Sequence, residues 1–303
     1  MRKNIIFVCS ALIFFAFLLY KENQSLVVTF CDVGQGDATL LTLGWVQILI
    51  DAGPNAKVLE CLENHLPFWD KKIEFFILTH MDRDHIGGAT QVLDYFDVDF
   101  IFMNPSNKKT SDFDLLEAAV SRKKSSGTVV VHTFVGQQVM VANQLTLTVA
   151  SPQVDFPQVE AQKTSSTETI LSDKNSDFLL EKISKISENN LSIALFVTFK
   201  NITLVLPGDL ESEGELALVR SGLPNQLSIL KAGHHGSKTS SSPQFIEVLK
   251  PEVTVISSGK NNSYNHPNPQ VVATFLAFGV TIYQTSTSGT VSFMTDGATF
   301  WEM

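Results

Sequence analysis

Four residues of types that bind metal ions in many proteins occur close together in the stretch from Thr79 to Gly88. They are His80, Asp82, Asp84 and His85. In an extended segment, residues two apart project to the same side, so the first three can converge, and His85 can point back at the same volume from just past the bend. Imidazole combined with carboxylate suits zinc or manganese. The alternative is a polar helix entry that Asp84 caps.

Two further groups with the same chemistry follow later in the chain. Asp209 ends the sequence Pro207-Gly208-Asp209, and His234 and His235 stand between two glycines. In all three places, the polar residues come directly after a short apolar run that predicts a buried strand. One such loop could be an ordinary turn, but three from separate parts of the chain favour a shared metal site.

The elements that must position these residues alternate in type along the chain. The predicted strands are 26–30, 38–43, 45–50, 73–78, 99–103, 129–134, 145–149, 191–199, 202–206, 227–230 and 253–257. The predicted helices are 57–65, 89–96, 112–125, 211–220, 243–249 and 268–278. Strands are followed by alternating strands and helices, twice over, which predicts two sheets face to face with helices outside. Polar loops would then meet at one edge, where ligand sites usually form.

Two segments differ in composition from the rest. Arg2 and Lys3 precede an apolar run from Ile5 to Tyr20, which predicts a signal-anchor, or else a cleaved signal peptide, over residues 1–25. A buried N-terminal strand or helix is the third alternative. Basic residues before the run favour a cytoplasmic N-terminus, with residues 26–303 exported as one domain. Residues 153–190 are poor in apolar side chains and predict a flexible insertion.

Charge and cysteine content restrict the function classes. The net charge is −9, from 22 basic and 31 acidic residues, which argues against a protein that coats nucleic acid through bulk positive charge. A phosphodiesterase is still allowed, because bound dications reverse the local field. Cys9 lies in the N-terminal run, which leaves Cys31 and Cys61. A bridge between these two is conceivable, and two buried free thiols are the preferred expectation.

Several other polar residues have two interpretations. Asp51 follows a predicted strand, where it could orient a ligand histidine or form an ordinary turn. Asp32 and Asp37 are expected to satisfy the amides of a glycine-rich loop rather than to line the site. Lys238 and Lys260 lie in loops near the histidines, where they could bind phosphate, although a solvated lysine is the commoner case.

The remaining candidates lie near predicted helix starts or on regular structure. His266, before Pro267, is either a proton donor or phosphate ligand, or a residue that caps the next helix. The stretch from Ser240 to Ser242 is expected to cap the helix over 243–249. His65 and His132 lie away from the motifs and are expected to be structural.

Taken together, these motifs resemble the metallo-β-lactamase fold superfamily, and more closely the hydrolase domain of ComEC-type competence proteins, the channels of bacterial DNA uptake. The resemblance covers about residues 26–293 and implies a four-layer αββα sandwich. The stretches that carry it are 32–37, 49–53, 79–88, 189–192, 207–209, 233–237 and 266–267.

The resemblance also implies two divalent metal ions, zinc or manganese. The ligands that it implies are His80 and Asp82 for one metal, Asp84, His85 and His234 for the other, and Asp209 between them. Asp84 would also orient the attacking water, and His235 would contact the substrate or support a ligand. The chain departs from the superfamily at Asp82, where a histidine is usual. It also lacks the middle-motif histidine, for which Asn189 or Asn190 is the nearest candidate, so the first site is expected to be weaker.

These observations support an exported, dinuclear metal-dependent hydrolase, a phosphodiesterase or nuclease related to the ComEC hydrolase domain. Its expected partners are a phosphodiester such as single-stranded DNA, and the membrane through the N-terminal segment. No stable nucleic-acid complex is expected from bulk charge. The alternatives are a β-lactamase, a cell-wall phosphoester hydrolase, or a non-catalytic membrane-tethered binding module. With one candidate membrane segment, the chain is not expected to be a DNA conduit by itself.

Overall fold

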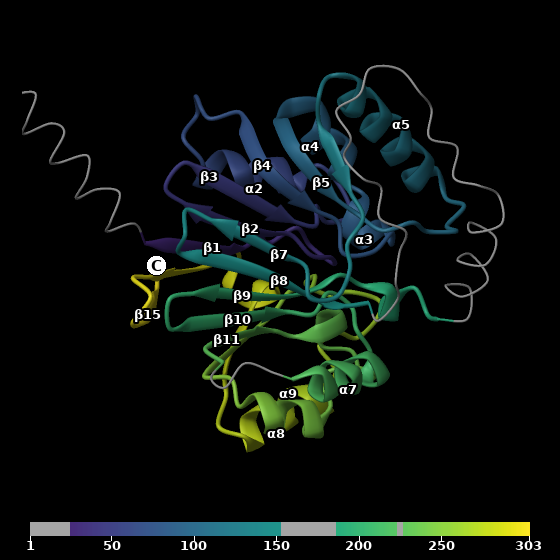
Figure 1. Ribbon diagram of the computed structural model, residues 1–303. Helices are drawn as coiled ribbons and strands as arrows, with labels where there is room; N and C mark the ends of the chain where they lie inside the picture. The colour runs from purple at the N-terminus through teal and green to yellow at the C-terminus, as the bar shows by residue number, and fades with distance from the viewer. Residues whose placement is uncertain (1–24, 153–185, 223–226) are drawn as a thin grey trace, which may run out of the picture.

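The computed structural model describes residues 25–152, 186–222 and 227–303. Two β-sheets pack face to face and helices cover their outer faces (Figure 1), which confirms the predicted two-sheet α/β sandwich. The predicted N-terminal anchor and most of the predicted insertion over 153–190 lie outside the described residues. None of the helices within the described ranges is both long and apolar enough to cross a membrane.

Among the described residues, the first sheet has eight strands in the order β15-β14-β1-β2-β3-β4-β5-β6. Its antiparallel part precedes a parallel part that runs from β3 to β6. The bounds are β1 (Leu26–Phe30), β2 (Thr39–Leu43), β3 (Val46–Ile50), β4 (Lys72–Ile77), β5 (Asp97–Phe102), β6 (Val129–Val131), β14 (Val291–Thr295) and β15 (Phe300–Glu302). Its helices are α2 (Lys57–His65), α3 (Arg83–Ile86), α4 (Ala89–Tyr95) and α5 (Ser111–Ser125).

The second sheet has seven described strands in the order β13-β12-β11-β10-β9-β8-β7, and β10 to β13 are parallel. The bounds are β7 (Gln138–Val141), β8 (Leu145–Ser151), β9 (Ala194–Phe199), β10 (Ile202–Leu206), β11 (Ile229–Lys231), β12 (Val253–Ile256) and β13 (Thr281–Gln284). Its helical segments are η1 (Asn189–Leu191), α7 (Ser212–Ser221), η2 (Gly233–Gly236), α8 (Pro243–Leu249), α9 (Pro269–Ala277) and α10 (Thr285–Ser288).

Apolar side chains fill the space between the two sheets and the space under each helical layer. Phe30 and Phe293 from the first sheet and Phe199 from the second are fully buried in the central layer. Burial of each such side chain stabilises the fold by about 1.5–3 kcal/mol. The sheets are therefore fixed against each other, and so are the loops that leave their edges.

Helix starts follow the expected capping chemistry. The Ser242 hydroxyl accepts a hydrogen bond from the amide of Phe245, and Pro243 opens α8, which confirms the predicted serine cap. At α9 the cap is the side chain of Asn268, which accepts from the amide of Gln270. His266 is therefore not the residue that caps this helix.

The structure departs from the predicted elements at two edges. Strand β7 was not predicted, because Gln138 and Met140 are exposed and its apolar pattern is short. The strand predicted from residue 191 begins only at Ala194, because the 3₁₀ turn η1 occupies residues 189–191. The first difference is a whole strand at the edge of the second sheet. The second lies at an element end, where backbone hydrogen bonding decides the boundary.

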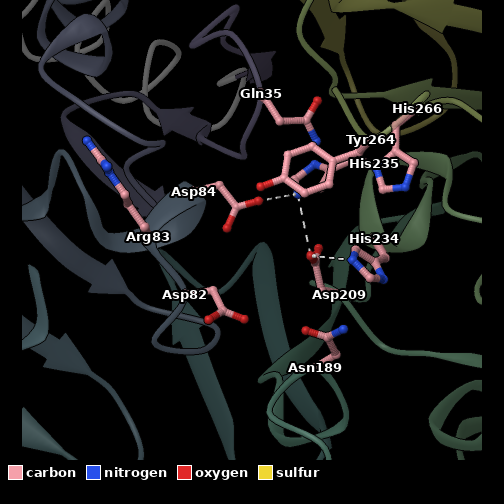
Figure 2. A pocket seen from close by; sticks show the side chains of 10 residues that line it. All are labelled: Gln35, Asp82, Arg83, Asp84, Asn189, Asp209, His234, His235, Tyr264 and His266. Carbon is pink, nitrogen blue, oxygen red and sulfur yellow. Dashed lines mark ion pairs between the residues drawn. The ribbon is translucent and has the colours of Figure 1, made fainter. Parts of the chain in front are cut away.

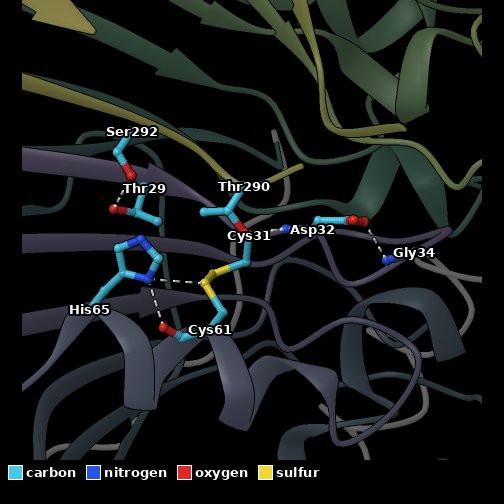
Figure 3. The surroundings of a disulfide bond; sticks show 8 residues. All are labelled: Thr29, Cys31, Asp32, Gly34, Cys61, His65, Thr290 and Ser292. Carbon is cyan, nitrogen blue, oxygen red and sulfur yellow. Dashed lines mark hydrogen bonds between the residues drawn. A yellow bond between two sulfur atoms is a disulfide. The ribbon is translucent and has the colours of Figure 1, made fainter. Parts of the chain in front are cut away.

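Cys31 and Cys61 form a disulfide bond, so the expectation of two free thiols was wrong (Figure 3). Cys31 follows the end of β1, and Cys61 lies on the inner face of α2, with their Cα atoms 5.9 Å apart. This proximity arises from the packing of α2 on the sheet and has no signature in the sequence spacing. The bond links α2 to the first residue of the loop that leads to Asp37.

Candidate metal centre

Loops from both sheets meet at one edge of the sandwich and bring the motif residues together. The Nε2 atom of His85, after β4, lies 3.3 Å from Oδ2 of Asp209, after β10. The Nε2 atom of His235, after β11, lies 3.4 Å from the same oxygen. Three stretches that are far apart in the sequence therefore share one small volume (Figure 2).

Four buried residues form what we call the inner cluster: Asp37, His85, Asp209 and His235. Each offers one ligand atom, and these atoms all lie within 4.8 Å of one another. Oδ2 of Asp84 reaches the edge of this cluster, 3.2 Å from Nε2 of His235, while its side chain remains about one-third exposed to the pocket. The inner cluster therefore combines two imidazoles and two carboxylates, with a third carboxylate on its solvent side.

Asp51 fixes the orientation of His85. Its carboxylate accepts hydrogen bonds from Nδ1 of His85 at 2.7 Å and from the amide and hydroxyl of Thr79 at 2.8 and 2.7 Å. Because Nδ1 is held in this way, Nε2 is directed at Asp209. The interpretation of Asp51 as a residue that orients a histidine is confirmed, and this is the usual way in which proteins set the direction of a metal-binding imidazole.

His235 is fixed by a different partner. Its Nδ1 donates to the carbonyl oxygen of Ser257 at 2.9 Å, and its side chain is buried. His234 points elsewhere: its Nε2 lies 3.8 Å from Asp209 and its side chain is 24% exposed. The sequence expectation gave the ligand role to His234, whereas the structure places His235 inside the inner cluster.

The carboxylates set the charge state of the cluster. Burial by itself lowers the pKa of His235, but Asp209 and Asp37 outweigh it and raise the pKa to about 10. Burial also lowers the pKa of His85, and Asp209 and Asp51 raise it well above its ordinary value. The pKa of Asp209 is held well below its usual range against its burial, chiefly by the same two imidazoles. The cluster therefore attracts cations, whether protons or metal ions.

Asp37 and Lys231 are site residues that the sequence reasoning missed. The Lys231 ammonium is buried, contacts the Asp37 carboxylate, lies 3.6 Å from Asp209 and donates to the carbonyl of Gly208 at 3.2 Å. Its signal in the sequence is a lysine at the end of the apolar run before the histidine motif. Burial lowers the pKa of Lys231, but Asp37 and Asp209 outweigh that effect and raise it.

The glycine-rich loop carries Asp37 inward through a close backbone approach. Gly36 has a φ of 149°, and a Cβ at this position would overlap the carbonyl of Asp84. The next amide, that of Asp37, donates to this same carbonyl at 3.1 Å. Asp32 behaves as expected, because its carboxylate accepts from the amide of Gly34.

His80 and Asp82 form a second group, which we call the outer pair. Nε2 of His80 lies 3.5 Å from Oδ2 of Asp82, and Nδ1 lies 3.3 Å from the hydroxyl of Ser192. The ring centroids of His80 and His85 are 4.1 Å apart, so the outer pair adjoins the inner cluster. Burial raises the pKa of Asp82, but contacts with His80 and with Lys108 outweigh it and lower the pKa to about 2.

The donor atoms fit a divalent metal ion. The Nε2 atoms of His80, His85 and His235 are buried, and none has a hydrogen-bond partner within the described part of the chain. Buried polar atoms are almost always paired in folded proteins, so three such nitrogens facing carboxylates indicate a ligand set. The combination of imidazole and carboxylate suits zinc, manganese or iron.

A pocket of about 350 Å³ opens onto these groups. Its lining residues, drawn in Figure 2, are Gln35, Asp82, Arg83, Asp84, Asn189, Asp209, His234, His235, Tyr264 and His266. Asn189, one candidate for the missing histidine, thus faces the pocket, while the carbonyl oxygen of the Asn190 side chain accepts from the amide of Glu211. Burial and the nearby His235 lower the pKa of His266 to about 4.

No model of a known protein family matches this chain. It has homologues among competence proteins: ComE operon protein 3 of Bacillus subtilis is 27% identical over 306 residues, covering 94% of this chain and 35% of that protein. Recombination protein 2 of Haemophilus influenzae is 27% identical over 287 residues, covering 92% and 30% respectively. The chain therefore spans about a third of the length of these relatives.

The fold has neighbours among solved structures. Igni18, described as a metallo hydrolase from the archaeon Ignicoccus hospitalis, superposes with a TM-score of 0.50 at 14% identity, covering 88% of this chain and 98% of that chain. The chain thus has the metallo-β-lactamase fold and ComEC-type homologues, and its cluster of acids and imidazoles could hold a divalent metal ion.

Proposed function

We propose that this chain, with its metallo-β-lactamase fold and ComEC-type relatives, is a dinuclear phosphodiesterase that acts on nucleic acid strands. The observation that carries the proposal is the direction of the three unpaired Nε2 atoms, which face Asp82, Asp84 and Asp209 across a short distance. The homologues named for competence and recombination support a DNA substrate.

Two divalent metal ions, zinc or manganese, would be held by residues that the fold already orients. His85, Asp84 and His235 would hold one ion, His80 and Asp82 would hold the other, and the carboxylate of Asp209 would be shared between them. Bound dications in such a site lower the pKa of water and polarise a phosphoryl oxygen. They also offset the negative charge of the carboxylates, so that an anionic phosphodiester can enter.

The side chains of the pocket would divide the remaining work. Asp84 lies on the pocket side of the inner cluster, where its free oxygen can accept a hydrogen bond from a water molecule and align that water with the phosphorus. His234 and His266, whose ring centroids are 5.6 Å apart, line the same pocket and can hydrogen-bond to phosphate oxygens. The ammonium of Lys231, paired with Asp37, would hold the carboxylate of Asp209 in place.

The test measures metal content together with cleavage of bis-p-nitrophenyl phosphate, single-stranded DNA and nitrocefin. We expect metal-dependent cleavage of the two phosphodiesters and none of the β-lactam. Removal of metal by a chelator should abolish it, and Asp84→Ala should lower kcat by about 100-fold or more. Asp114→Ala, at an exposed position of α5, is the matched control. A metal-loaded protein inert on every phosphodiester would overturn the proposal.

We also propose that the domain works outside the cytoplasm, attached to the membrane by the N-terminal segment. The disulfide between Cys31 and Cys61 supports this location, because such bonds persist in oxidising compartments. In intact cells, externally added protease should reach and digest the domain. An alkylating reagent applied without a reducing thiol should find both cysteines oxidised and leave them unmodified. A domain protected from protease in spheroplasts, with both thiols reduced, would contradict export.

A further inference from the structure

The loop from Gly259 to Pro267 places an exposed aromatic ring at the metal pocket. Tyr264 is 65% exposed, yet it lines the same pocket as Asp84 and His235 (Figure 2). Its ring stacks on the ring of His266, with centroids 5.8 Å apart and planes 27° from parallel. A tyrosine so exposed contributes little to the core, and its ring is accessible to a molecule that enters the pocket.

The loop is held rigidly by the side chain of Asn262. Its carbonyl oxygen accepts from the amides of Tyr264 and His266 at 3.1 and 3.0 Å, and its nitrogen donates to the carbonyls of Gly259 and His266 at 2.9 and 2.5 Å. Both ends of the turn carrying Tyr264 are thereby fixed, although the ring itself faces solvent.

The same loop is tied to two of the loops that form the inner cluster. At its start, the amide of Gly259 donates to the side-chain oxygen of Gln35, two residues before Asp37. Just after its end, the amide of Asn268 donates to the carbonyl of Gly236, next to His235. The ring of Tyr264 therefore has a defined position relative to the inner cluster.

We propose that Tyr264 is a stacking platform for an unpaired nucleobase next to the scissile phosphodiester. This inference rests on the proposed function and specifies its substrate as single-stranded nucleic acid. A base can stack on an exposed protein ring only when it has left a duplex, and such stacking is sequence-tolerant. Stacking on an uncharged ring would contribute nothing to the binding of a substrate that has no planar group.

A second pocket is also lined by His266 and adjoins the first one there. It has a volume of about 400 Å³. Its lining includes Lys260, Asn261 and Asn262, together with Ser286 and Thr287. An ammonium group and several amide and hydroxyl groups suit a phosphate and sugar of a neighbouring nucleotide. The substrate would therefore extend over at least two nucleotides, with His266, which lines both pockets, between them.

The experiment compares the metal-loaded full chain on a decathymidylate and on an abasic strand of the same length. For each variant the measured quantity is kcat/KM on the decathymidylate divided by kcat/KM on the abasic strand. Tyr264→Ala should lower this ratio about 5- to 150-fold, the range given by the known stacking energies. Tyr264→Phe and Tyr264→Trp, which keep a flat ring, should retain the ratio. Trp45→Ala, an exposed ring beyond the opposite end of β3, is the matched control.

The possible outcomes separate this inference from the proposed function. If Tyr264→Ala leaves the ratio unchanged, or lowers kcat/KM equally on both strands, the platform is overturned and phosphodiesterase activity stands. Cleavage of bis-p-nitrophenyl phosphate with neither strand cleaved also overturns the platform and leaves phosphodiesterase activity standing. If no phosphodiester is cleaved by metal-loaded protein, the proposed function fails and the platform fails with it. Melting temperature and metal content of each variant identify loss of folding.

Discussion

The inner cluster and the outer pair contain the same two residue types, but their surroundings differ. In the inner cluster, His85 and His235 are buried, and the Nδ1 atom of each has a partner at 2.7 or 2.9 Å. In the outer pair, Asp82 is about one-third exposed and its carboxylate already contacts the ammonium of Lys108. One group is oriented before any ligand arrives, and the other must exchange a partner.

This difference indicates an order of metal binding. A ligand set whose rings are already fixed loses little conformational freedom when it binds a cation. The outer pair must separate Asp82 from Lys108, and it offers a single histidine nitrogen, that of His80. We therefore expect the inner site to fill first and to hold its metal more tightly than the outer site.

The largest effect is expected for Asp209→Asn. Asp209 contacts both histidines of the inner cluster, His85 and His235, and in the proposed centre its carboxylate is shared with the outer pair, so losing its charge would remove an anion from both groups. We expect kcat/KM to fall by about 1,000-fold or more and the bound metal to fall to near zero, because the amide neither bridges nor neutralises dications. Activity assays and elemental analysis check this. Retention of two metal equivalents would remove the basis for treating the two groups as one centre.

The next largest effect concerns stability. Cys61→Ser removes a bond that closes a 30-residue separation, so unfolding free energy should fall by about 3–4 kcal/mol. Urea titration of the wild type and variant measures the loss. Because the bond precedes the loop that carries Asp37, metal should leave the inner cluster at lower denaturant than in the wild type. An unchanged midpoint would show that α2 is held by packing alone.

A paired comparison of the two adjacent histidines tests the boundary of the inner cluster. His235→Asn should lower metal affinity and kcat about 100-fold, in the range seen when a ligand or its support is lost. His234→Asn should change kcat/KM about 10-fold or less and leave the metal content intact, because this ring lines the pocket instead. The reverse ranking would return the ligand role to His234.

A smaller effect is expected from the outer pair. Asp82→Ala should leave about one metal equivalent bound, with the affinity of the second site reduced about 10- to 100-fold. Lys108→Met should act in the opposite direction, because it removes the competing ammonium from Asp82. Metal titration by calorimetry distinguishes the two sites. Equal loss from both sites in Asp82→Ala would contradict the proposed order of binding.

The smallest effect is expected at Glu215, which lies outside the inner cluster and serves as a control through the pH dependence of stability. Glu215 is buried, accepts from the amides of Ser241 and Ser242, and its burial raises its pKa above 4.5. The unfolded chain then ionises first as the pH rises, so this group makes stability fall between pH 4.5 and its folded pKa. Glu215→Gln should remove that slope, by about 1 kcal/mol or less. Parallel pH–stability curves for wild type and variant would show that folding does not raise the pKa of Glu215.

The sequence was sufficient to predict where the site loops lie but not how each side chain is used. Short apolar runs ending in glycine and polar residues located β4, β10 and β11 to within about two residues. Pattern alone could not choose between His234 and His235, because a turn has no periodic pattern that would tell which of two adjacent side chains points into the site. It missed Lys231 and the site role of Asp37 because both depend on contact between the two sheets. It preferred free thiols to the disulfide because that bond depends on how α2 packs on the first sheet.

The turn that carries the two histidines has a cost to the fold. His234 and His235 have φ angles of 47° and 54°, in the left-handed region that non-glycine residues disfavour by about 1–2 kcal/mol each. Glycine at position 234 would relieve part of that penalty, and the exposed ring offers little packing in return. Natural selection for stability alone would therefore replace His234. Only selection for catalysis would then keep His234. A descendant that lost activity should therefore lose this imidazole early.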